Sequence, residues 1–517
     1  MAVDTTIVSA PGKVLLTGGY LVLDQQYKGL VVATDSRFYV AIRQRSKQDS
    51  PFPTITVRSP QFTDGRWNYL VKSREDGSGI ELTSIPSPPT TAFSPHDTEN
   101  RYVECTLSHT LEVVAGLAPD WKTKMSAGMD IVIVGSNDFY SQREQLSSRG
   151  LPLTSASLSS LPPFCSTLCS IRNVHKTGLG SSAAMITSLV GGILNHFGAI
   201  QLPAASVSMT GNSSKISEVE RYALSLAHNC AQLCHCLAQG KIGSGFDVSA
   251  AVFGSHSYRR FSPTVLDALM EHRSGSPSSR LRDLVDTIDP MRSHSWDNEV
   301  SQFHLPPNFT LMLADIDAGS STYKLVSEVL RWRRTHTEEA DALWTKLDLE
   351  NARIEQYMRD LSRIAEHQKA GYESVLSTCA EAKASSWCNL VVGDDLVHVK
   401  NNFSTVYETF QSVRKYLRDM SVKAGVPIEP PGQTRLLDAC LEVPGVIMAG
   451  VPGAGGYDAI FCLVISEAAR QKVRRLWSTW TEMAVGPLLT QQSSTGLVRI
   501  DRPGDIPGLE KAMCSFE

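Results

Sequence analysis

The fold of this chain is decided by one glycine-rich stretch, Lys176-Thr177-Gly178-Leu179-Gly180-Ser181-Ser182-Ala183-Ala184-Met185. Apolar residues follow it at helical spacing, at Ile186, Leu189, Val190, Ile193 and Leu194. The stretch is therefore predicted to be a loop that opens a helix. Glycine permits close approach of the backbone, and the first N–H groups of a helix lack intrahelical partners and lie at the positive end of its dipole. Such a loop binds anions, phosphates above all.

The side chains of this loop favour a nucleotide phosphate as the anion. Lys176 adds a positive charge, and the hydroxyls of Ser181 and Ser182 can cap the helix, bond a phosphate oxygen or ligate magnesium. On the local pattern alone an ordinary serine N-cap stays open as an alternative, and the spacing matches neither Walker A nor the Rossmann fingerprint. We predict that ATP contacts Lys176, Gly178, Leu179, Gly180, Ser181, Ser182 and Ala183.

Length and composition indicate a globular enzyme of two domains. The chain has 517 residues, of which 42% are hydrophobic and 20% charged, and both values are ordinary for globular proteins. The formal net charge of -4 argues against binding to nucleic acid, because nucleic-acid domains usually carry a basic excess. An anionic substrate must therefore be held by local positive charge.

The cysteines and the chain ends indicate a reducing compartment. The 11 cysteines include no Cys-x-x-Cys pair, so we expect reduced thiols. His235 lies between Cys234 and Cys236, but this spacing does not suit structural zinc. The N-terminus has no basic segment before an apolar core, no run approaches ~18 apolar residues, and the final residues match no peroxisomal address. We expect a cytoplasmic protein without membrane contact.

A second motif lies near the N-terminus. Ala10-Pro11-Gly12-Lys13 precedes an apolar run interrupted by Gly18-Gly19-Tyr20. This pattern predicts a strand, a loop and a second strand. Pro11 and Gly12 would place Lys13 at the edge of the loop, where an ammonium is positioned without being buried. A lone lysine is more often solvated surface, so Lys13 by itself does not define a site.

A third motif follows a helical pattern that runs from Ser217 to Gln239. It consists of Gly240-Lys241-Ile242-Gly243-Ser244-Gly245-Phe246-Asp247 and continues into small apolar residues. A glycine-flanked aspartate is commonly a helix N-cap, which is the structural alternative. The small residues would also let the Asp247 carboxylate approach both a phosphate loop and an acceptor.

Two further loops lie in the second half of the chain. A strand from Phe309 to Ile316 leads into a hydroxyl-rich loop with Ser320 and Ser321, for which helix capping is the alternative. The segment from Val446 to Val464 predicts two strands joined by the turn Gly453-Ala454-Gly455-Gly456. A hairpin could require these glycines on its own.

The order of these elements predicts an α/β (α+β) protein. Polar sequence between residues 262 and 301 marks a domain boundary. Residues 1–300 would place helices against a mixed sheet. Residues 301–517 would be helical around a smaller sheet, with amphipathic helices over residues 338–365 and 403–424.

The motifs occur in the order found in the GHMP kinases, the superfamily of galactokinase, homoserine kinase, mevalonate kinase and phosphomevalonate kinase, and the chain resembles that family. The likeness leaves residues 73–100, 150–167 and 262–300 uncovered. Within the family the chain is most similar to the eukaryotic, fungal-type phosphomevalonate kinases. Mevalonate kinases usually have Pro-Pro-Gly-Ala where this chain has His175-Lys176-Thr177. A lysine at this place suits two phosphorylated reactants.

The resemblance implies a two-domain GHMP kinase fold with the ATP site in the cleft between the domains. It implies ATP-dependent phosphorylation of (R)-5-phosphomevalonate to 5-diphosphomevalonate, in the mevalonate route to isoprenoids and sterols, with Mg²⁺. The alternatives are a mevalonate kinase, another GHMP small-molecule kinase, or a non-catalytic sensor with the same fold. The partners would be ATP and the small-molecule substrate, bound by a monomer or homodimer.

The resemblance also implies the catalytic residues, namely Asp247, Lys13 and Lys176. Ser182 is the one metal ligand that can be carried over. Mevalonate kinase supplies a glutamate from the helix before its catalytic aspartate. The matching helix of this chain offers Gln232, His235 and Gln239.

Binding residues are implied less directly. Asn100–Val103 and Asn137–Gln142, with Asn137 foremost, are the candidates for the adenine end of the nucleotide. The acceptor would be bound by Lys13, Tyr20, Ser244, Gly245, Ser320, Ser321, Gly453 and Gly455.

Overall fold

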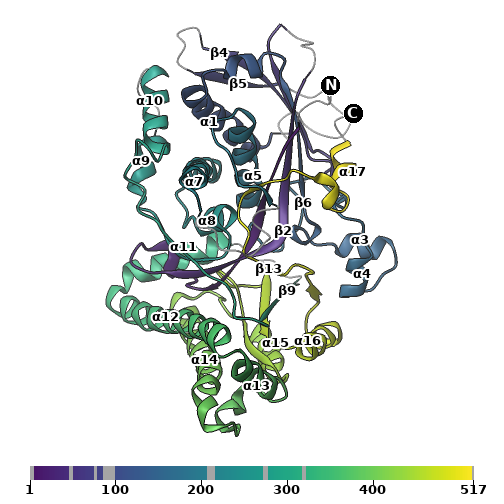
Figure 1. Ribbon diagram of the computed structural model, residues 1–517, viewed down its shortest axis with the longest axis vertical. Coiled ribbons are helices and arrows are strands. Elements are labelled where there is room, and N and C mark those ends of the chain that lie inside the picture. The colour runs from purple at the N-terminus through teal and green to yellow at the C-terminus, as the bar shows by residue number, and fades with distance from the viewer. Residues whose placement is uncertain are drawn as a thin grey trace.

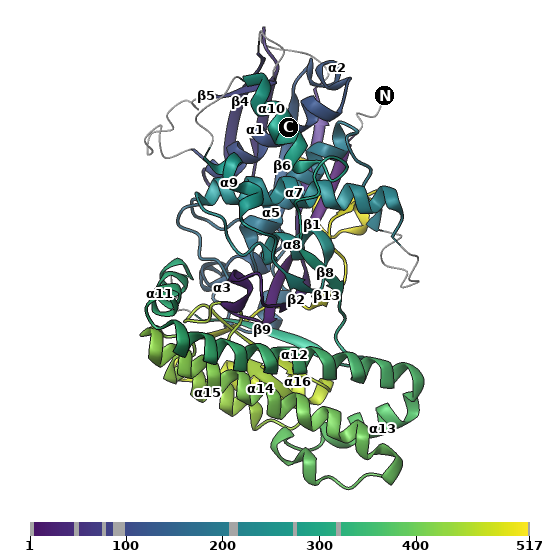
Figure 2. The ribbon, with the colours of Figure 1, turned by 90° about the vertical axis from the view of Figure 1, so that its left-hand side faces the viewer.

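The computed structural model describes residues 5–45, 51–74, 79–85, 99–205, 216–271, 277–316 and 322–514. They form two domains, one above the other in Figure 1, with a large sheet in the first and a smaller sheet in the second. Figure 2 shows long helices of the second domain running side by side below the first. Ser320 and Ser321, which are predicted to bind the acceptor, lie outside the described residues.

The strands of the larger sheet are β1 (Thr5–Thr17), β2 (Gly29–Gln44), β3 (Thr54–Arg58), β4 (Arg66–Ser73), β5 (Ile80–Ile85), β6 (Met129–Gly135), β7 (His256–Arg259), β8 (Glu299–Gln302), β13 (Gln492–Ser493) and β14 (Val498–Arg499). Their main order is β14-β1-β2-β6-β3-β4-β5, while β13 and β7 pair with β2, and β8 pairs with β7. Only β3 and β6 pair parallel among these described strands. The sheet is therefore mixed, as predicted.

The helices of the first domain are α1 (Arg101–Leu117), α2 (Trp121–Met125), α3 (Arg143–Ser148), α4 (Ser155–Ser159), α5 (Ser181–His196), α7 (Glu218–Gln239), α8 (Phe246–Phe253), α9 (Thr264–Met270), α10 (Pro277–Ile288) and α17 (Leu509–Met513). Helix α5 packs on β1 and β2, and α1 and α7 pack on α5 (Figure 1). The apolar residues predicted to form the buried face of α5 are all buried. Their burial fixes the position of the glycine-rich loop, because that loop begins the helix.

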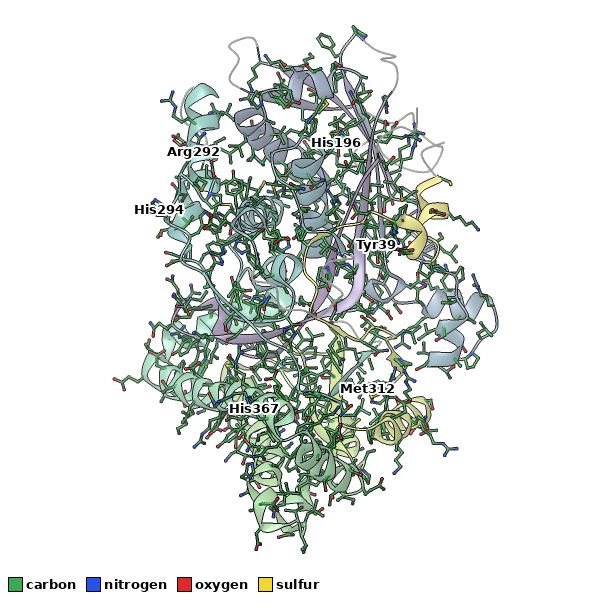
Figure 3. All side chains as sticks on the ribbon, in the orientation of Figure 1. Tyr39, His196, Arg292, His294, Met312 and His367 are labelled. Carbon is green, nitrogen blue, oxygen red and sulfur yellow. The ribbon has the colours of Figure 1, made fainter. Side chains whose placement is uncertain are left out.

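The smaller sheet consists of β10 (Val446–Gly450), β11 (Ala459–Val464), β9 (Thr310–Ile316) and β12 (Val485–Pro487), in that order and antiparallel. Its helices are α11 (Thr322–Thr335), α12 (Thr337–His367), α13 (Lys369–Ala380), α14 (Val397–Ala424), α15 (Pro431–Leu441) and α16 (Glu467–Thr479). Helices α12 and α14 pack together along their length (Figure 2). Figure 3 labels Met312 of β9 in this domain and Tyr39 of β2 in the larger sheet.

Two local predictions about the N-terminal motif are wrong. The chain through Pro11 and Gly12 is one continuous strand, β1, whose register with β2 shifts between Pro11 and Lys13. A bulge of this kind accommodates a proline, which has no N–H to donate, without ending the strand. The predicted second strand is a short 3₁₀ helix at Leu21–Leu23.

The end of the chain returns to the first domain. After β12, strand β13 pairs with β2 and β14 pairs with β1. The division at residue 300 stays a prediction, but these pairings attach the last strands of residues 301–517 to the larger sheet. Over the described ranges, no helix has the length and apolar character needed to cross a membrane.

Candidate active site

The glycine-rich loop is held against the N-terminal lysine. Gly180 has a φ of 77°, and a Cβ at this position would lie 2.9 Å from Lys13 Cε. The Lys13 backbone N–H donates to Leu179 O at 3.0 Å, and Lys13 Nζ donates to Gly178 O at 2.8 Å. Glycine at position 180 therefore serves both the positive φ and the close approach of Lys13. Two motifs far apart in the sequence form one surface.

Asp247 lies in the first turn of α8, beside the same loop. Its Oδ1 accepts a hydrogen bond from the Val248 N–H at 3.0 Å. A Cβ on Gly180 would lie 3.7 Å from Asp247 Cβ. Burial lowers the pKa of the Lys13 ammonium, and the Asp247 carboxylate partly offsets that effect. A cation and an anion thus face one another beside the N-terminus of α5.

Helix α7 contributes His235 to this group. Its Nε2 lies 3.2 Å from Ser182 Oγ, 2.9 Å from Gln239 Nε2 and 4.0 Å from Asp247 Oδ2. Burial lowers the pKa of the imidazole, against the opposing effect of the Asp247 carboxylate. The ring lies between the phosphate loop and the aspartate, and its burial disfavours the charged form.

A polar cavity of about 580 Å³ opens beside these residues. Ser244 and Gly245, two of the predicted acceptor contacts, line it. Hydrogen bonds to their backbone carbonyl oxygens fix this loop. The Tyr258 hydroxyl donates to Ser244 O, and Gln232 Nε2 donates to Gly245 O, both at 2.8 Å. The charged and titratable residues of its lining are Lys13, His175, Lys176, His235, Cys236, Lys241, Asp247 and Asp458.

A second, mostly apolar cavity of about 340 Å³ adjoins the same loop. Residues Asn100–Val103, predicted for the adenine end, contribute to its lining. Lys176, Ser181 and Ser182 line both cavities, so the phosphate loop is their common boundary. Burial lowers the pKa of Lys176. The apolar lining consists of Phe38, Phe62, Trp67, Ile133, Tyr140, Ile171 and Met185.

Asn137 lines neither of these cavities. Its Nδ2 donates to Pro162 O at 2.9 Å, and its Oδ1 accepts from the Cys165 N–H at 2.8 Å. The amide thus holds a neighbouring loop, and the contact between Asn137 and the nucleotide stays a prediction. Nearby Tyr140 does line the apolar cavity, and its backbone bridges to Lys176.

The glycine-rich turn of the second domain packs on the N-terminal motif. Tyr20 is 3% exposed and its hydroxyl donates to Ala454 O at 2.6 Å. A Cβ on Gly19 would lie 2.4 Å from Gly453 O. Tyr20, Gly453 and Gly455 are absent from the lining of the polar cavity within the described residues. Tyr20 and Gly453 take part in the contact between the domains, whereas a Cβ on Gly455 would lie 2.2 Å from Ile428 O of the same domain. Their contact with the acceptor stays a prediction.

Comparison with known proteins identifies the family. Residues 405–480 match the family described as GHMP kinases C terminal. The chain is 36% identical over 501 residues to the peroxisomal phosphomevalonate kinase of Arabidopsis thaliana, with 93% of each chain covered. It is 34% identical over 508 residues to a phosphomevalonate kinase of Aspergillus fumigatus, with 93% of this chain and 91% of that one covered. This chain belongs to the phosphomevalonate kinases of the GHMP family.

Solved structures share its fold. A phosphomevalonate kinase of Streptococcus pneumoniae, in complex with phosphomevalonate and AMPPNP, has a TM-score of 0.54 at 12% identity and covers 94% of this chain and 99% of its own. The Lin0012 protein of Listeria innocua has a TM-score of 0.59 at 14% identity, with 96% and 100% covered. The predicted GHMP kinase fold is confirmed.

The oxygen donors beside the phosphate loop would fit a magnesium ion held mainly by the phosphates of a bound nucleotide. In the part of the chain that the structure describes, no cluster of three or more His, Cys, Asp or Glu side chains could hold a metal. Ser182 Oγ lies at the start of α5, and Asp247 is the nearby carboxylate. Mg²⁺ commonly keeps several waters and binds one or two protein oxygens together with phosphates. This sparse set of oxygens is compatible with that habit.

Several lining residues were not identified from the sequence. Phe62 comes from a loop and Trp67 from β4, and both line the apolar cavity together with Ser181 and Ser182 of the phosphate loop. Buried residues alternate along β4, which predicts a covered face but no ligand. Lys241 lies within the motif Gly240–Asp247, and Asp458 follows the turn Gly453–Gly456 by two positions. This closeness to glycine-rich motifs could have identified them as lining residues.

Proposed function

We propose that this chain transfers the γ-phosphoryl group of ATP to (R)-5-phosphomevalonate and releases 5-diphosphomevalonate and ADP. The observation that carries the proposal is the meeting of an apolar and a charged cavity at Lys176, Ser181 and Ser182. The names of the plant and fungal relatives support the choice of acceptor. So does the pneumococcal enzyme, whose complex contains phosphomevalonate and AMPPNP.

The nucleotide spans the boundary between the cavities. The adenine occupies the apolar cavity, where aromatic side chains such as Tyr140 offer stacking surface. The triphosphate meets the N–H groups at the start of α5 and the Lys176 ammonium. The acceptor occupies the polar cavity, against Lys13 and the loop that contains Ser244 and Gly245. Ser320 and Ser321 stay predicted acceptor ligands.

The acceptor phosphate is itself the nucleophile. Its second pKa of about 6 makes it mostly dianionic at neutral pH. One of its oxygens forms a bond to the γ-phosphorus while the bond from that phosphorus to the bridging oxygen of the β-phosphate breaks, and ADP leaves with the electron pair. No strong base is needed, so Asp247 orients Lys13 and the acceptor. The ammonium groups of Lys13 and Lys176 offset the repulsion among the phosphates and the Asp247 carboxylate.

Ser182 is the residue that would hold magnesium together with the ATP phosphates. When bound, the ion neutralises charge on the β- and γ-phosphates. The contribution of the chain is positional, since α5 is anchored by its buried face and fixes the Ser182 hydroxyl beside the phosphate loop.

A purified-protein assay against a panel of acceptors tests this function. With ATP and magnesium supplied, phosphomevalonate should turn over faster than mevalonate, homoserine or galactose, and Asp247→Asn serves as the matched low-activity control. Faster turnover of mevalonate would assign mevalonate kinase activity instead. Nucleotide binding without turnover of any acceptor would favour the sensor.

A cytoplasmic location and a monomeric or homodimeric state belong to the same proposal. The location is supported by the absence of a Cys-x-x-Cys pair among the cysteines, which suits reduced thiols. The plant relative is named peroxisomal, so imaging of the tagged full chain beside a peroxisomal marker distinguishes the two compartments. Light scattering of the purified protein gives the oligomeric state.

A further inference from the structure

Helix α7 presents an uncharged polar face to the polar cavity. Gln232, His235 and Gln239 all line the cavity, and their spacing of three and four residues places them on one side of the helix. His235 is 5% exposed and lies within hydrogen-bond distance of the phosphate loop, 3.2 Å from Ser182 Oγ. The Ser182 hydroxyl is the group proposed to hold the metal, so His235 contacts the proposed metal ligand.

The hydrogen bonds around His235 have a definite direction. A neutral imidazole has one nitrogen that donates and one that accepts. The Gln239 side-chain nitrogen faces His235 Nε2 at 2.9 Å, and an amide nitrogen can only donate. With the amide in this orientation Nε2 is the acceptor and the ring proton is assigned to Nδ1. The Ser182 hydroxyl faces the same Nε2 at 3.2 Å and, in this tautomer, donates to it, sharing the single lone pair with the Gln239 N–H.

A hydroxyl that donates to His235 turns its oxygen lone pairs away from the ring. Without an acceptor at this place, the Ser182 hydroxyl could rotate and donate to a phosphate oxygen, and its lone pairs would then be turned away from the metal. Asp247 Oδ2 lies 4.0 Å from His235 Nε2, which is too far for a hydrogen bond, so the aspartate does not compete for the nitrogen.

We propose that His235 is a positioning residue that accepts the Ser182 hydroxyl proton and thereby presents the Ser182 oxygen to the metal ion bound with ATP. The proposal rests on the proposed kinase function. It deepens that function by naming a histidine on the face of α7 that lines the polar cavity, where the described helix residues of the lining include no carboxylate. Partners that orient a metal ligand typically account for about 10- to 100-fold in metal affinity or activity.

Calorimetry of AMPPNP binding, with magnesium and with EDTA, tests the role of His235. In His235→Leu the affinity measured with magnesium should fall about 10-fold or more, while the affinity in EDTA stays within about twofold. His235→Gln keeps an acceptor of similar reach and should retain most of the magnesium effect. The matched control is His256→Leu, because His256 is also buried, faces a serine hydroxyl at 2.8 Å and is outside the polar cavity lining in the described residues. It should leave the magnesium effect unchanged.

Two results would overturn the proposal. One is normal magnesium-dependent binding in His235→Leu, and the other is an equal loss with and without magnesium, which indicates a disturbed pocket. If His235→Leu does not fold, Ser182→Ala tests the same contact from the hydroxyl side: it should lower the affinity measured with magnesium about 10-fold or more but not the affinity in EDTA, and an unchanged magnesium effect refutes the role. AMPPNP binding involves no acceptor. Failure of the wild type to phosphorylate phosphomevalonate would thus refute the proposed function separately.

Discussion

The two cavities that meet at the phosphate loop are built in different ways. The polar cavity is formed largely by glycine-rich motifs, whose backbone must approach Lys13 and Asp247 closely. The apolar cavity is lined by side chains from β2, β4, β6, α1 and α5 together with residues of the loops between such elements, among them Phe62, Tyr140 and Ile171. Chemistry on phosphates needs precise backbone donors and small residues. A nucleotide base needs mainly a flat apolar surface, and no short run of consecutive residues has to provide such a surface.

We expect the largest loss of activity from a substitution in the polar cavity. Asp247→Asn should lower kcat about 100-fold or more with little change in ATP affinity, because the amide no longer orients Lys13 electrostatically. Steady-state kinetics and AMPPNP calorimetry measure the two quantities. A near-normal kcat would remove Asp247 from the catalytic residues and with it the division of roles between the cavities.

Lys176, at the boundary that the two cavities share, should affect both kcat and KM for ATP. Lys176→Met removes a cation that lines both cavities, so we expect kcat to fall and KM for ATP to rise, each about 10-fold or more. An effect on KM alone would place Lys176 with the nucleotide only. Lys241→Met, a change of the same kind in the polar cavity, should leave the ATP affinity nearly unchanged.

The apolar cavity should affect binding without affecting chemistry. Trp67→Leu shrinks an aromatic wall, and we expect KM for ATP to rise roughly 5- to 10-fold at nearly constant kcat, in line with a lost aromatic contact of about 1 kcal/mol. Trp121→Leu changes another buried tryptophan, at 8% exposure and outside this lining within the described chain, and controls for stability. A drop in kcat in Trp67→Leu would contradict the separation of the two cavities.

Asp138 should affect stability more than activity. Among the described residues, it is outside the lining of both cavities. Its carboxylate accepts from the Leu489 N–H at 2.8 Å and from Ser36 Oγ at 3.1 Å, so it ties the returning C-terminal chain to β2. Burial raises the pKa of Asp138 to about 6. The folded state therefore binds this proton more tightly than the unfolded state, whose pKa is about 3.9.

The stability linked to Asp138 is present at low pH and is lost as the pH rises through about 6. The loss amounts to up to about 3 kcal/mol. Asp138→Asn removes this titration. Urea unfolding at pH 4.5 and 7.5 should therefore show the wild type losing stability relative to the variant at the higher pH. A difference that does not change with pH would place the Asp138 pKa at its ordinary value.

Helix boundaries show how much local sequence can predict. The helical pattern from Ser217 to Gln239 matches α7, because Ser217 and Glu220 form a capping box and Gly240 ends the helix at a φ of 71°. Helix α1 begins in a similar way, since its N-cap Asn100 accepts from the backbone N–H groups of Tyr102 and Val103. Caps use neighbours along the chain, so they can be recognised before any fold is known.

The sequence by itself identified the family and the phosphate loop and predicted Lys13, Lys176 and Asp247 as site residues, because a tight turn or a close backbone approach restricts consecutive positions. Only the tertiary structure decided that Tyr20 bonds to Ala454 and that Asn137 holds a neighbouring loop. It also decided that the last strands return to the first sheet and that His235 faces Ser182. Each of these contacts joins residues whose separation along the chain says nothing about their distance in space, and that distance is set by how the helices and the two sheets pack.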